Sequence, residues 1–256
     1  AGWQLQPRRA TVQGALDHAL ERLLGTDDFT SRGCSRTDAG VHALDQHVTV
    51  TLPDDPPVPV HAGARALANL LPADIRLQSA VDVPDSFHLR DHVRGKAYSY
   101  VVYRGRMDSP FQVGRAWEIQ DDLELDRMTR AAAALAGEHD FSAFAVNPRD
   151  KRAVDPVCRL HALHWREDGP FLVLTVIGDR FLYRMMRRLT GFLTAVGRGR
   201  MPADGAAILL AQEPNALPAF NTAPAHGLYL ERVFATDAEL QAYRVPAVLP
   251  HRQLLP

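Results

Sequence analysis

The most constraining feature of this sequence is a pair of strand-like segments joined by a tight turn. Residues 158–166 and 171–177 flank Glu167-Asp168-Gly169-Pro170, whose composition is typical of a turn between two strands. The second segment is the longest strongly apolar run of the chain, and it is far shorter than the roughly 18 residues that cross a membrane. The pair therefore predicts an antiparallel hairpin within a sheet, and it argues against a membrane as a partner.

Helical and strand-like patterns alternate through the rest of the chain. Apolar residues recur at helical spacing from Val12 to Leu23, with Thr11 as an N-cap and Gly25 as a stop. Further helices are predicted at 61–71, 123–136, 183–196 and 204–212, and further strands at 47–52, 75–81, 97–104, 113–119 and 228–233. Because several strands follow one another directly, this order predicts a mixed α/β (α+β) fold with antiparallel sheets.

Composition and charge exclude several classes of protein. The 256 residues are 46% hydrophobic and 23% charged, which is typical of a folded globular chain and not of a disordered one. A formal net charge of −1 excludes a uniformly basic protein that coats nucleic acid, but it is compatible with a local basic surface. Cys34 and Cys158 belong to no C-x-x-C motif, so we expect a reducing, cytoplasmic environment and no disulfide scaffold.

The sequence lacks the common cofactor and hydrolase motifs. Gly95-Lys96 is not a P-loop because Arg90 stands where that motif needs glycine, and neither G-x-S-x-G nor H-E-x-x-H occurs. Histidine pairs at 88/92 and 161/164 have spacings found in zinc sites, but a chain with 11 histidines contains such pairs by chance. Neither a metal nor an organic cofactor is therefore predicted.

A polar turn with one carboxylate follows the first helix. It reads Gly33-Cys34-Ser35-Arg36-Thr37-Asp38-Ala39-Gly40-Val41-His42-Ala43, and its small residues leave room for another molecule's backbone or ring to approach Asp38. Arg36 would help to keep the carboxylate ionised, as an aspartate acting as a nucleophile or base requires. An aspartate that only bonds the amides of its own turn fits the same residues, so both interpretations stay open.

Arginine is concentrated in a second segment. All but two of the 29 basic residues are arginine, and six of these lie between positions 180 and 200 without an acidic residue among them. On a helix, four would fall within one arc of about 100°, opposite an apolar face: Arg180, Arg184, Arg187 and Arg188. This arginine ridge suits RNA phosphates, and a solvated helix face accounts for it equally well.

The two segments together resemble the tRNA pseudouridine synthase A family. Residues 33–43 are similar to that family's catalytic-aspartate motif, with Ser35 where many members have glycine. Further similar blocks follow in the family's order, at 68–75, 87–90, 96–100, 137–144, 181–187 and 223–230. The resemblance covers nearly the whole chain except the C-terminal tail.

The resemblance implies roles for particular residues. Asp38 matches the catalytic aspartate, Tyr98 the tyrosine that stacks on the target base, and Arg187 the arginine that pairs with the aspartate. The other arginines of the ridge would bind RNA phosphates. The implied catalytic residues are Asp38 and Arg187, and the implied substrate-binding residues are Tyr98, Arg36, Arg180, Arg184 and Arg188.

The family isomerises uridine to pseudouridine at positions 38, 39 and 40 of the tRNA anticodon stem-loop. It uses neither a metal nor an organic cofactor, and it acts as a homodimer that holds tRNA across both subunits. The resemblance therefore implies tRNA and a second copy of the chain as partners. For the aspartate, attack on the sugar carbon, attack on the uracil ring and removal of a sugar proton all remain open.

The family's fold has two similar halves whose antiparallel sheets join around a basic central cleft. By resemblance we expect an N-terminal α/β half at 1–90 with the aspartate loop and a C-terminal α/β half at 91–242 with the arginine-rich helix. A proline-rich tail is expected at 243–256. The family's first strand would precede Gly2-Trp3-Gln4, so we expect this strand to be missing from the given chain.

A different class of function remains open from the residues alone. A non-catalytic RNA-binding protein would use the arginine ridge and the aromatic strand around Tyr98, and it would have no need of Asp38. It predicts salt-sensitive tRNA binding without turnover. A metal-dependent hydrolase is a third interpretation, which metal analysis would identify.

Overall fold

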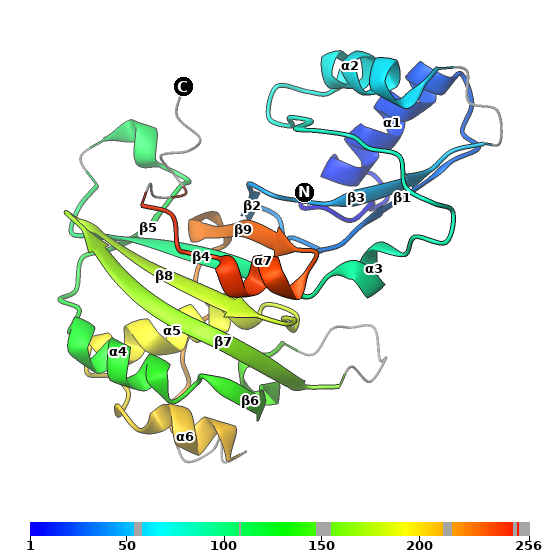
Figure 1. The fold of residues 1–256 in the computed structure, drawn as a ribbon. Helices are drawn as coiled ribbons and strands as arrows, with labels where there is room; N and C mark the ends of the chain where they lie inside the picture. Colours follow the sequence, from blue (N-terminus) through cyan, green and yellow to red (C-terminus); the bar gives the residue numbers. More distant parts are fainter. Residues whose placement is uncertain (54–57, 108, 147–154, 212–216, 248–249, 251–256) are drawn as a thin grey trace. The chain divides into compact units, whose positions relative to one another are not determined.

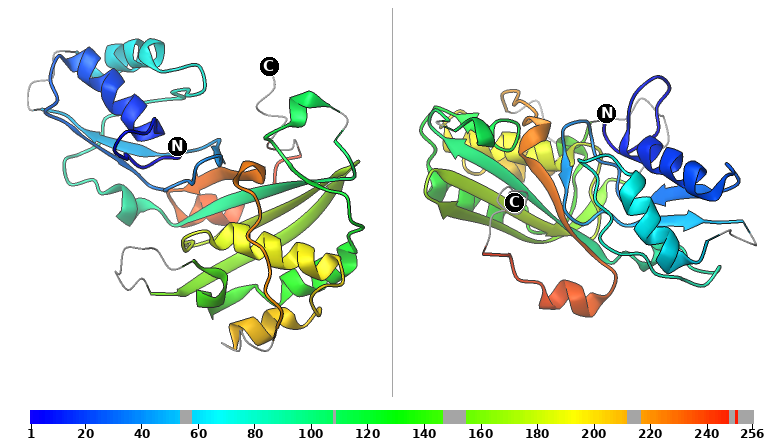
Figure 2. Two further views of the ribbon diagram at one scale, coloured as in Figure 1. Left: turned by 180° about the vertical axis from the view of Figure 1, so that it is seen from behind. Right: turned by 90° about the horizontal axis from the view of Figure 1, so that it is seen from above.

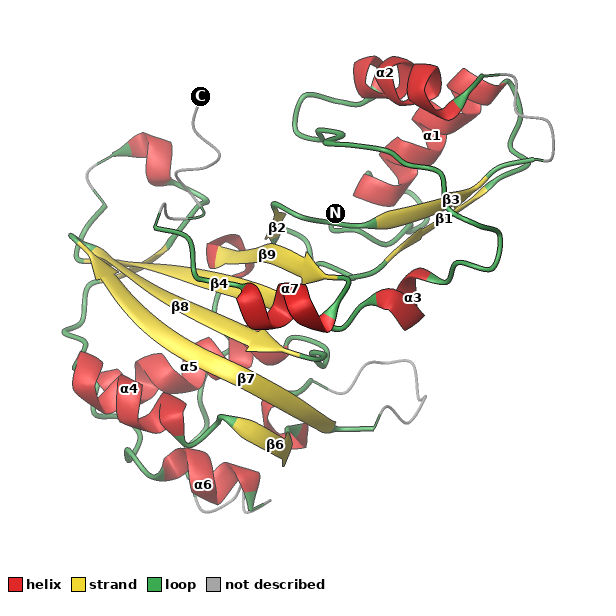
Figure 3. Ribbon diagram, in the orientation of Figure 1, coloured by secondary structure: helices red, strands yellow, loops and turns green. Residues whose placement is uncertain are grey.

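The computed structural model describes residues 1–53, 58–107, 109–146, 155–211, 217–247 and 250, and it has the mixed α/β architecture expected from the sequence (Figures 1 and 3). The chain forms two compact units. Unit 1 comprises Ala1–Ala39 and Gln46–Val93, and unit 2 comprises Gly40–Asp45 and the chain from Arg94 onward. The short segment 40–45 therefore belongs to unit 2, although unit 1 surrounds it in the sequence. The expected division after residue 90 stays a prediction.

Unit 1 packs two helices against a strand pair. Its elements are α1 (Val12–Leu24), β1 (Thr30–Gly33), β3 (Val48–Thr51), α2 (Val60–Leu70) and α3 (Leu89–His92). The side chain of Thr11 accepts a hydrogen bond from the Gly14 N–H, and Gly25 ends α1 in the left-handed conformation with φ of 70°. Both predicted ends of this helix are confirmed.

The core of unit 1 lies between its helices and its sheet. Among the described residues, β1 and β3 form a two-stranded antiparallel sheet, and α1 and α2 lie over one face of it (Figure 2). Ala19 and Leu20 of α1 are buried against Leu67 of α2, and Val50 of β3 and Phe29, the residue before β1, pack against this cluster. The strand predicted at 75–81 is wrong, because these residues form no helix or strand and pair with no described strand.

Unit 2 is built on a larger, mostly antiparallel sheet. Its strands are β2 (His42–Ala43), β4 (Gly95–Arg104), β5 (Trp117–Ile119), β6 (Gly137–Asp140), β7 (Val157–Asp168), β8 (Phe171–Gly178) and β9 (Leu228–Phe234). Within the described chain their order is β2-β9-β4-β8-β7-β6, with β5 beside β4, and only the β2–β9 and β4–β5 pairs are parallel. The predicted hairpin is confirmed as β7 and β8, where Asp168 pairs with Phe171.

Helices cover both faces of this sheet. On one face lie α4 (Leu125–Ala133), α5 (Met185–Gly197) and α6 (Gly205–Leu210), and on the other lies α7 (Asp237–Ala242) (Figures 1 and 2). Most residues of α5 are buried, among them Leu189, Phe192 and Val196. This burial confirms the predicted apolar face of the arginine-rich helix, which therefore lies in the core of unit 2.

Several predicted boundaries in unit 2 are wrong. The helix expected at 123–136 ends at Ala133, and Gly137 adopts φ of 104° and begins β6. The strand expected from residue 113 begins only at Trp117, because Gly114 turns the chain with φ of 73°. The helix expected to reach residue 212 ends at Leu210, and residue 212 lies outside the described residues.

The start of the expected tail packs against unit 2. The rings of Tyr243 and Phe234 lie 5.0 Å apart, edge to face. The Arg166 guanidinium donates to the carbonyl oxygens of Pro246 at 2.6 Å and Ala247 at 3.0 Å. Of the predicted tail, residues 248–249 and 251–256 lie outside the described residues.

Gly191 of α5 permits an unusually close approach of the chain at 221–223. A Cβ atom at position 191 would lie 1.9 Å from the Asn221 carbonyl oxygen. We therefore expect Gly191→Ala to lower the free energy of unfolding by about 3 kcal/mol, the upper end of the usual cost of overpacking. Gly63→Ala in α2 is the matched control, because its Cβ would meet only ordinary contacts at 3.7 Å and 3.9 Å. Urea unfolding followed by circular dichroism measures the free energy of unfolding. Equal values for Gly191→Ala and Gly63→Ala would contradict this account.

Candidate active site

The aspartate loop lies at the end of β1, inside unit 1. β1 ends at Gly33, and residues 34–39 lead from it to Gly40, where the chain enters unit 2. Asp38 is half-buried, and Arg36 is exposed to solvent. The predicted loop between the first helix and the strand at 48–51 is therefore confirmed, and Asp38 lies two residues before the crossing between the units.

Three hydrogen bonds hold this loop from outside. The Cys34 N–H donates to the His47 carbonyl oxygen at 2.9 Å, the Gln46 Nε2 to the Ser35 carbonyl oxygen at 2.7 Å, and the Trp3 N–H to the Thr37 carbonyl oxygen at 3.0 Å. In each bond the loop contributes a backbone atom: the Cys34 N–H, the Ser35 carbonyl oxygen or the Thr37 carbonyl oxygen. The backbone around Asp38 is therefore fixed by residues on both sides of it in the sequence.

Tyr98 lies in the middle of the unit 2 sheet. It belongs to β4, pairs with Val176 of β8 and Leu230 of β9, and is 9% exposed. The pairing with β9 shifts register between Ala97 and Tyr98, an irregularity that can re-aim a side chain. The Phe181 ring lies edge-on to the Tyr98 ring, with centroids 4.9 Å apart. Tyr98 is thus held by a second aromatic residue from the segment before α5.

Arg187 is attached to the segment 223–227 at the first turn of α5. Its Nε donates to the Ala223 carbonyl oxygen at 2.7 Å, and its own carbonyl oxygen accepts from the Ala223 N–H at 3.0 Å. Arg187 is half-buried, and a guanidinium bonded through Nε has its orientation fixed. The close approach at Gly191 described above brings this segment to the helix.

Tyr100 and His226 complete the surroundings of Arg187. The Tyr100 hydroxyl donates to the Pro224 carbonyl oxygen at 2.7 Å, and burial raises the pKa of this phenol well above its usual value despite the opposing charge of Arg187. Burial also lowers the pKa of His226; a hydrogen bond with the Ala116 backbone acts against this effect, and electrostatic interactions with His42 and Arg187 add to it. Both side chains are therefore neutral at neutral pH, and Arg187 supplies the positive charge of this group.

Sequence reasoning missed the segment 223–227 as a functional element. In the sequence it belongs to the block at 223–230 that is similar to the family, and no role was predicted for it. Its signal was the small residues Ala223, Ala225 and Gly227 next to Pro224, a composition that permits close backbone approach. A Cβ atom at Gly227 would lie 2.7 Å from the Tyr100 ring, which shows how closely this segment packs.

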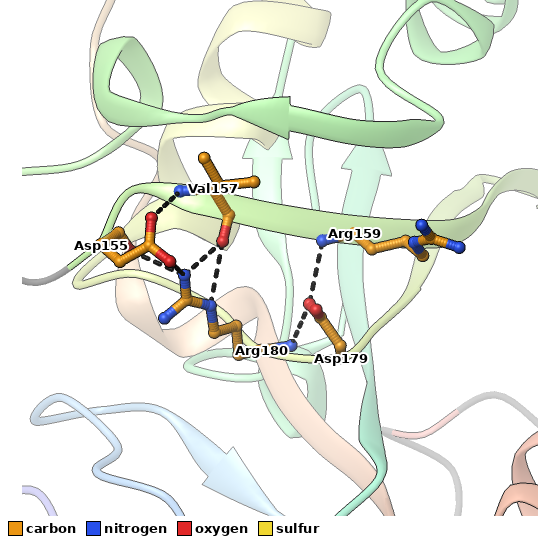
Figure 4. Close-up of polar contacts among 5 residues, drawn as sticks. All are labelled: Asp155, Val157, Arg159, Asp179 and Arg180. Carbon is orange, nitrogen blue, oxygen red and sulfur yellow. Dashed lines mark hydrogen bonds and ion pairs between the residues drawn. The ribbon is translucent and has the colours of Figure 1, made fainter.

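Arg180 does not lie on the helix that was predicted to carry it, because α5 begins at Met185. Its guanidinium forms an ion pair with the Asp155 carboxylate at 2.8 Å and donates to the Val157 carbonyl oxygen (Figure 4). The pKa of Asp155 is lowered, first by the Val157 N–H and then by Arg180. Asp179 accepts hydrogen bonds from the N–H groups of Arg159 and Arg180, which connects the segment before α5 to β7 (Figure 4).

The other two arginines of the predicted ridge also differ from one another. Arg184 precedes α5 in the left-handed conformation with φ of 60°, is exposed, and lies over the Tyr183 ring at 5.0 Å. Arg188 is on α5 and faces inward, donating to the Ala143 carbonyl oxygen at 3.1 Å and stacking on Phe220 at 4.5 Å. Burial lowers the pKa of Arg188. The expectation of one arc of four arginines is therefore wrong, while their binding to RNA stays a prediction.

The structure thus brings some predicted residues together and leaves others separate. Tyr98 and Arg187 belong to unit 2, and Asp38 and Arg36 belong to unit 1. The pairing of Asp38 with Arg187 stays a prediction. In the described ranges, no three histidine, cysteine, aspartate or glutamate side chains are placed to hold a metal ion. No helix of those same ranges is long and apolar enough to cross a membrane.

Comparison with known proteins decides the family. The model of a family described as tRNA pseudouridine synthase matches residues 131–234. The tRNA pseudouridine synthase A of Bordetella petrii is 41% identical over 91% of this chain and 85% of its own length. That of Myxococcus xanthus is 41% identical over 92% and 87%, and that of Bacillus licheniformis 37% over 91% and 92%. The chain belongs to the tRNA pseudouridine synthase A family.

Membership in the tRNA pseudouridine synthase A family confirms the resemblance found in the sequence. The region matched by the family model runs from α4 to β9 and contains Arg187, whereas the relatives align over nearly the whole chain. Among solved structures, a chain of a Cbf5-Nop10-Gar1 complex is 12% identical over 76% of this chain and 50% of that chain, with a TM-score of 0.34.

Proposed function

We propose that this member of the tRNA pseudouridine synthase A family isomerises uridines 38, 39 and 40 of the tRNA anticodon stem-loop, with Asp38 as the reactive carboxylate. The coarser activity, that of an isomerase acting on uridine in tRNA, follows from the family. The choice of the stem-loop rests on the resemblance of the motif at 33–43. The choice of Asp38 also has support from the path of the chain.

The path of the chain near Gly40 is the observation that supports Asp38 most directly. Within unit 2, a Cβ atom at Gly40 would lie 3.4 Å from the Ala225 side chain, and Ala223, two residues before Ala225, accepts a hydrogen bond from the Arg187 Nε. Asp38 precedes Gly40 by two residues, and two trans peptide steps separate Cα atoms by at most about 7.6 Å. Asp38 therefore lies on the segment by which the chain enters unit 2, close to Gly40 along the backbone.

The reaction explains why these residue types are needed. The bond between ribose C1′ and uracil N1 breaks, the bound base turns, and C1′ bonds to C5, while N1 gains a proton and C5 loses one. No electrons are gained or lost overall, so the chemistry needs no redox group. It needs a carboxylate and side chains that bind the base while it turns. Arg187 would keep Asp38 ionised for attack on the sugar or base, or for removal of a sugar proton.

Tyr98 supplies an aromatic plane for the target base. A uridine inside a stem is stacked, so it must be turned out and held before its glycosidic bond can be reached. The Tyr98 ring is fixed by the Phe181 ring and by its place in the sheet. Exposed arginines such as Arg36 and Arg184 are suited to bind the neighbouring phosphates, because their side chains reach solvent.

We expect Tyr98→Leu to lower kcat/KM by about 5-fold to 150-fold, because stacking of a base on an aromatic side chain is worth about 1–3 kcal/mol. Tyr98→Phe keeps the ring, so it should keep the tRNA affinity of the parent, and its turnover then reports the separate contribution of the hydroxyl group. Filter binding and steady-state kinetics measure the two effects. A Leu variant with the affinity and rate of the parent would contradict the stacking role.

Mapping the product tests the proposed positions. An unmodified tRNA transcript is incubated with the protein, and pseudouridines are located by carbodiimide treatment and primer extension. The expected stops correspond to uridines 38, 39 and 40, and a transcript with cytidine at these positions should give none of them. Stops only at other positions would contradict the site assignment, and tRNA binding without any stop would favour the non-catalytic RNA-binding interpretation.

The proposal includes a homodimer and a cytoplasmic location. The homodimer follows from the resemblance to the family, and the cytoplasmic location from the two free cysteines. Sedimentation of the protein with and without tRNA tests the first, with a mass of about twice 28.3 kDa as the expected result for the free protein. A monomer that keeps full turnover would contradict the dimer.

A further inference from the structure

Gly2 lies directly against the backbone of the aspartate loop. It adopts φ of 65°, a left-handed conformation that favours glycine. A Cβ atom at this position would lie 2.6 Å from the Thr37 carbonyl oxygen, 3.0 Å from the Asp38 carbonyl carbon and 3.0 Å from the Ala39 nitrogen. These are backbone atoms, so no side-chain rotation could relieve the contact. Any other residue at position 2 would have to displace the chain on both sides of Asp38.

Trp3 contacts both the same loop and the strand that leads into it. Its N–H donates to the Thr37 carbonyl oxygen at 3.0 Å, immediately before Asp38. Its indole lies against Gly33, where a Cβ atom would be 2.6 Å from the ring, and the whole residue is only 3% exposed. One residue therefore contacts both Gly33, the last residue of β1, and the residue that precedes the carboxylate.

The first turn of α1 fixes Gly2 and Trp3 in turn. The Val12 N–H donates to the Gly2 carbonyl oxygen at 3.0 Å, and the Gln13 N–H to the Trp3 carbonyl oxygen at 3.0 Å. The first N–H groups of a helix have no partner within the helix, so these bonds satisfy donors that otherwise need water or a cap. Gly2 and Trp3 thus link the start of a regular helix to the backbone of the loop.

We propose that Gly2 and Trp3 are positioning residues for the Asp38 carboxylate. The inference rests on the proposed function, because it assigns a reactive role to Asp38. Gly2 and Trp3 act through the loop backbone and do not reach the reacting atoms themselves. A displacement of about 1 Å in a reactive group can cost about 10²-fold in rate. A loop held from one side by α1 and from the other by Gln46 resists such a displacement.

Gly2→Ala compared with Gly25→Ala separates positioning from backbone strain. Gly25 adopts φ of 70° in the same unit, but a Cβ atom there would meet nothing within 4 Å. The two variants therefore share the strain of a left-handed alanine, and only Gly2→Ala pushes on the loop. Under single-turnover conditions we expect Gly2→Ala to lower the rate constant by about 10-fold to 10²-fold. The tRNA dissociation constant should stay within about twofold of the parent, because a misplaced carboxylate affects the chemical step and not phosphate contacts.

Trp3→Phe is the second variant, and it tests the positioning role if Gly2→Ala does not fold. It keeps the backbone bond to Thr37 and removes part of the ring that lies on Gly33. We expect a smaller loss in rate constant than for Gly2→Ala, again without a matching loss of tRNA affinity. A purely structural role would lower the melting temperature and leave the rate constant of the folded variant unchanged.

The outcomes distinguish the inference from the function on which it rests. Tritium release by the parent and by Gly25→Ala, with slow release by Gly2→Ala or Trp3→Phe, supports the positioning role. Equal rate constants for the parent and the folded variants would overturn the positioning role and leave the proposed function intact. No release by the parent, with tRNA bound, would overturn the proposed function first.

Discussion

Asp38→Asn is expected to lower turnover by at least about 10³-fold while the tRNA dissociation constant stays within about twofold of the parent. The amide has nearly the shape of the carboxylate, but it can neither attack as an anion nor accept a proton with comparable basicity. The hydrogen bonds that hold the loop use backbone atoms at Thr37 and Ser35, so the fold around position 38 should persist. Single-turnover tritium release and filter binding measure the two quantities.

The matched control for this variant is Asp28→Asn. Asp28 is an exposed carboxylate of the same unit, and its replacement changes the net charge by the same amount. We expect the Asp28 variant to have the parent's rate, because a change in net charge alone acts on association with tRNA and not on the chemical step. A normal rate for Asp38→Asn, or equal losses for both variants, would remove the assigned role of Asp38.

The second large effect is expected for Arg187→Gln, which should lower kcat by about 10²-fold to 10³-fold, as for the loss of one preorganised charged donor. The variant loses the positive charge of the group around Tyr100 and His226, both of which are neutral. It also loses the Nε bond to the Ala223 carbonyl oxygen, so the segment 223–227 is held less firmly. Arg187→Lys restores the charge without the planar fork and should recover only part of the rate.

Arg184→Gln serves as the control for Arg187→Gln. Arg184 lies three residues earlier and is exposed, so its neutralisation should weaken tRNA binding and reduce the slope of log K against log salt by about 1. The rate constant at saturating tRNA should not change. Identical effects of the two glutamine variants would show that Arg187 acts only as a phosphate ligand.

Local patterns in the sequence predicted those parts of the fold whose causes are local. Thr11 and Gly25 set the ends of α1, and the alternating segments around Gly169 set the β7–β8 hairpin, because capping and turn formation involve residues a few positions apart. The strand β6 escaped detection because it exists only through pairing with β7, which brings Glu138 opposite Arg159. Short polar strands of this kind carry no periodic apolar signal.

The arginine-rich segment shows where helical periodicity misleads. The sequence from Arg180 to Arg188 fits a helix, but Asp179 caps the N–H of Arg180, and the Arg180 side chain bonds to residues 155–157, more than twenty positions away. The Arg180 side chain is thus held by the segment at 155–157, and α5 begins only at Met185. Arg188 then faces the core, which a basic ridge on a solvated face does not predict.

The residues alone singled out Asp38 and the arginine segment as candidates, and the resemblance assigned their roles. Asp38 and Arg187 are 149 positions apart in the sequence, and no local rule relates a turn aspartate to a helix arginine. The structure adds the attachment of Arg187 to Ala223 and that of the Asp38 loop to Gly2 and Trp3. Both attachments depend on glycines or alanines that permit close approach. In the sequence, such residues identify a contact only when the segment that approaches them is known.

The most direct test of the account uses tRNA that carries tritium at C5 of its uridines. The parent protein and Asp38→Ala are compared side by side for tritium release and for tRNA binding. The account predicts release by the parent, no release by Asp38→Ala, and binding of tRNA by both. Release by both would show that Asp38 is not the reactive group, and binding without release by either would show a protein that binds RNA without isomerising it.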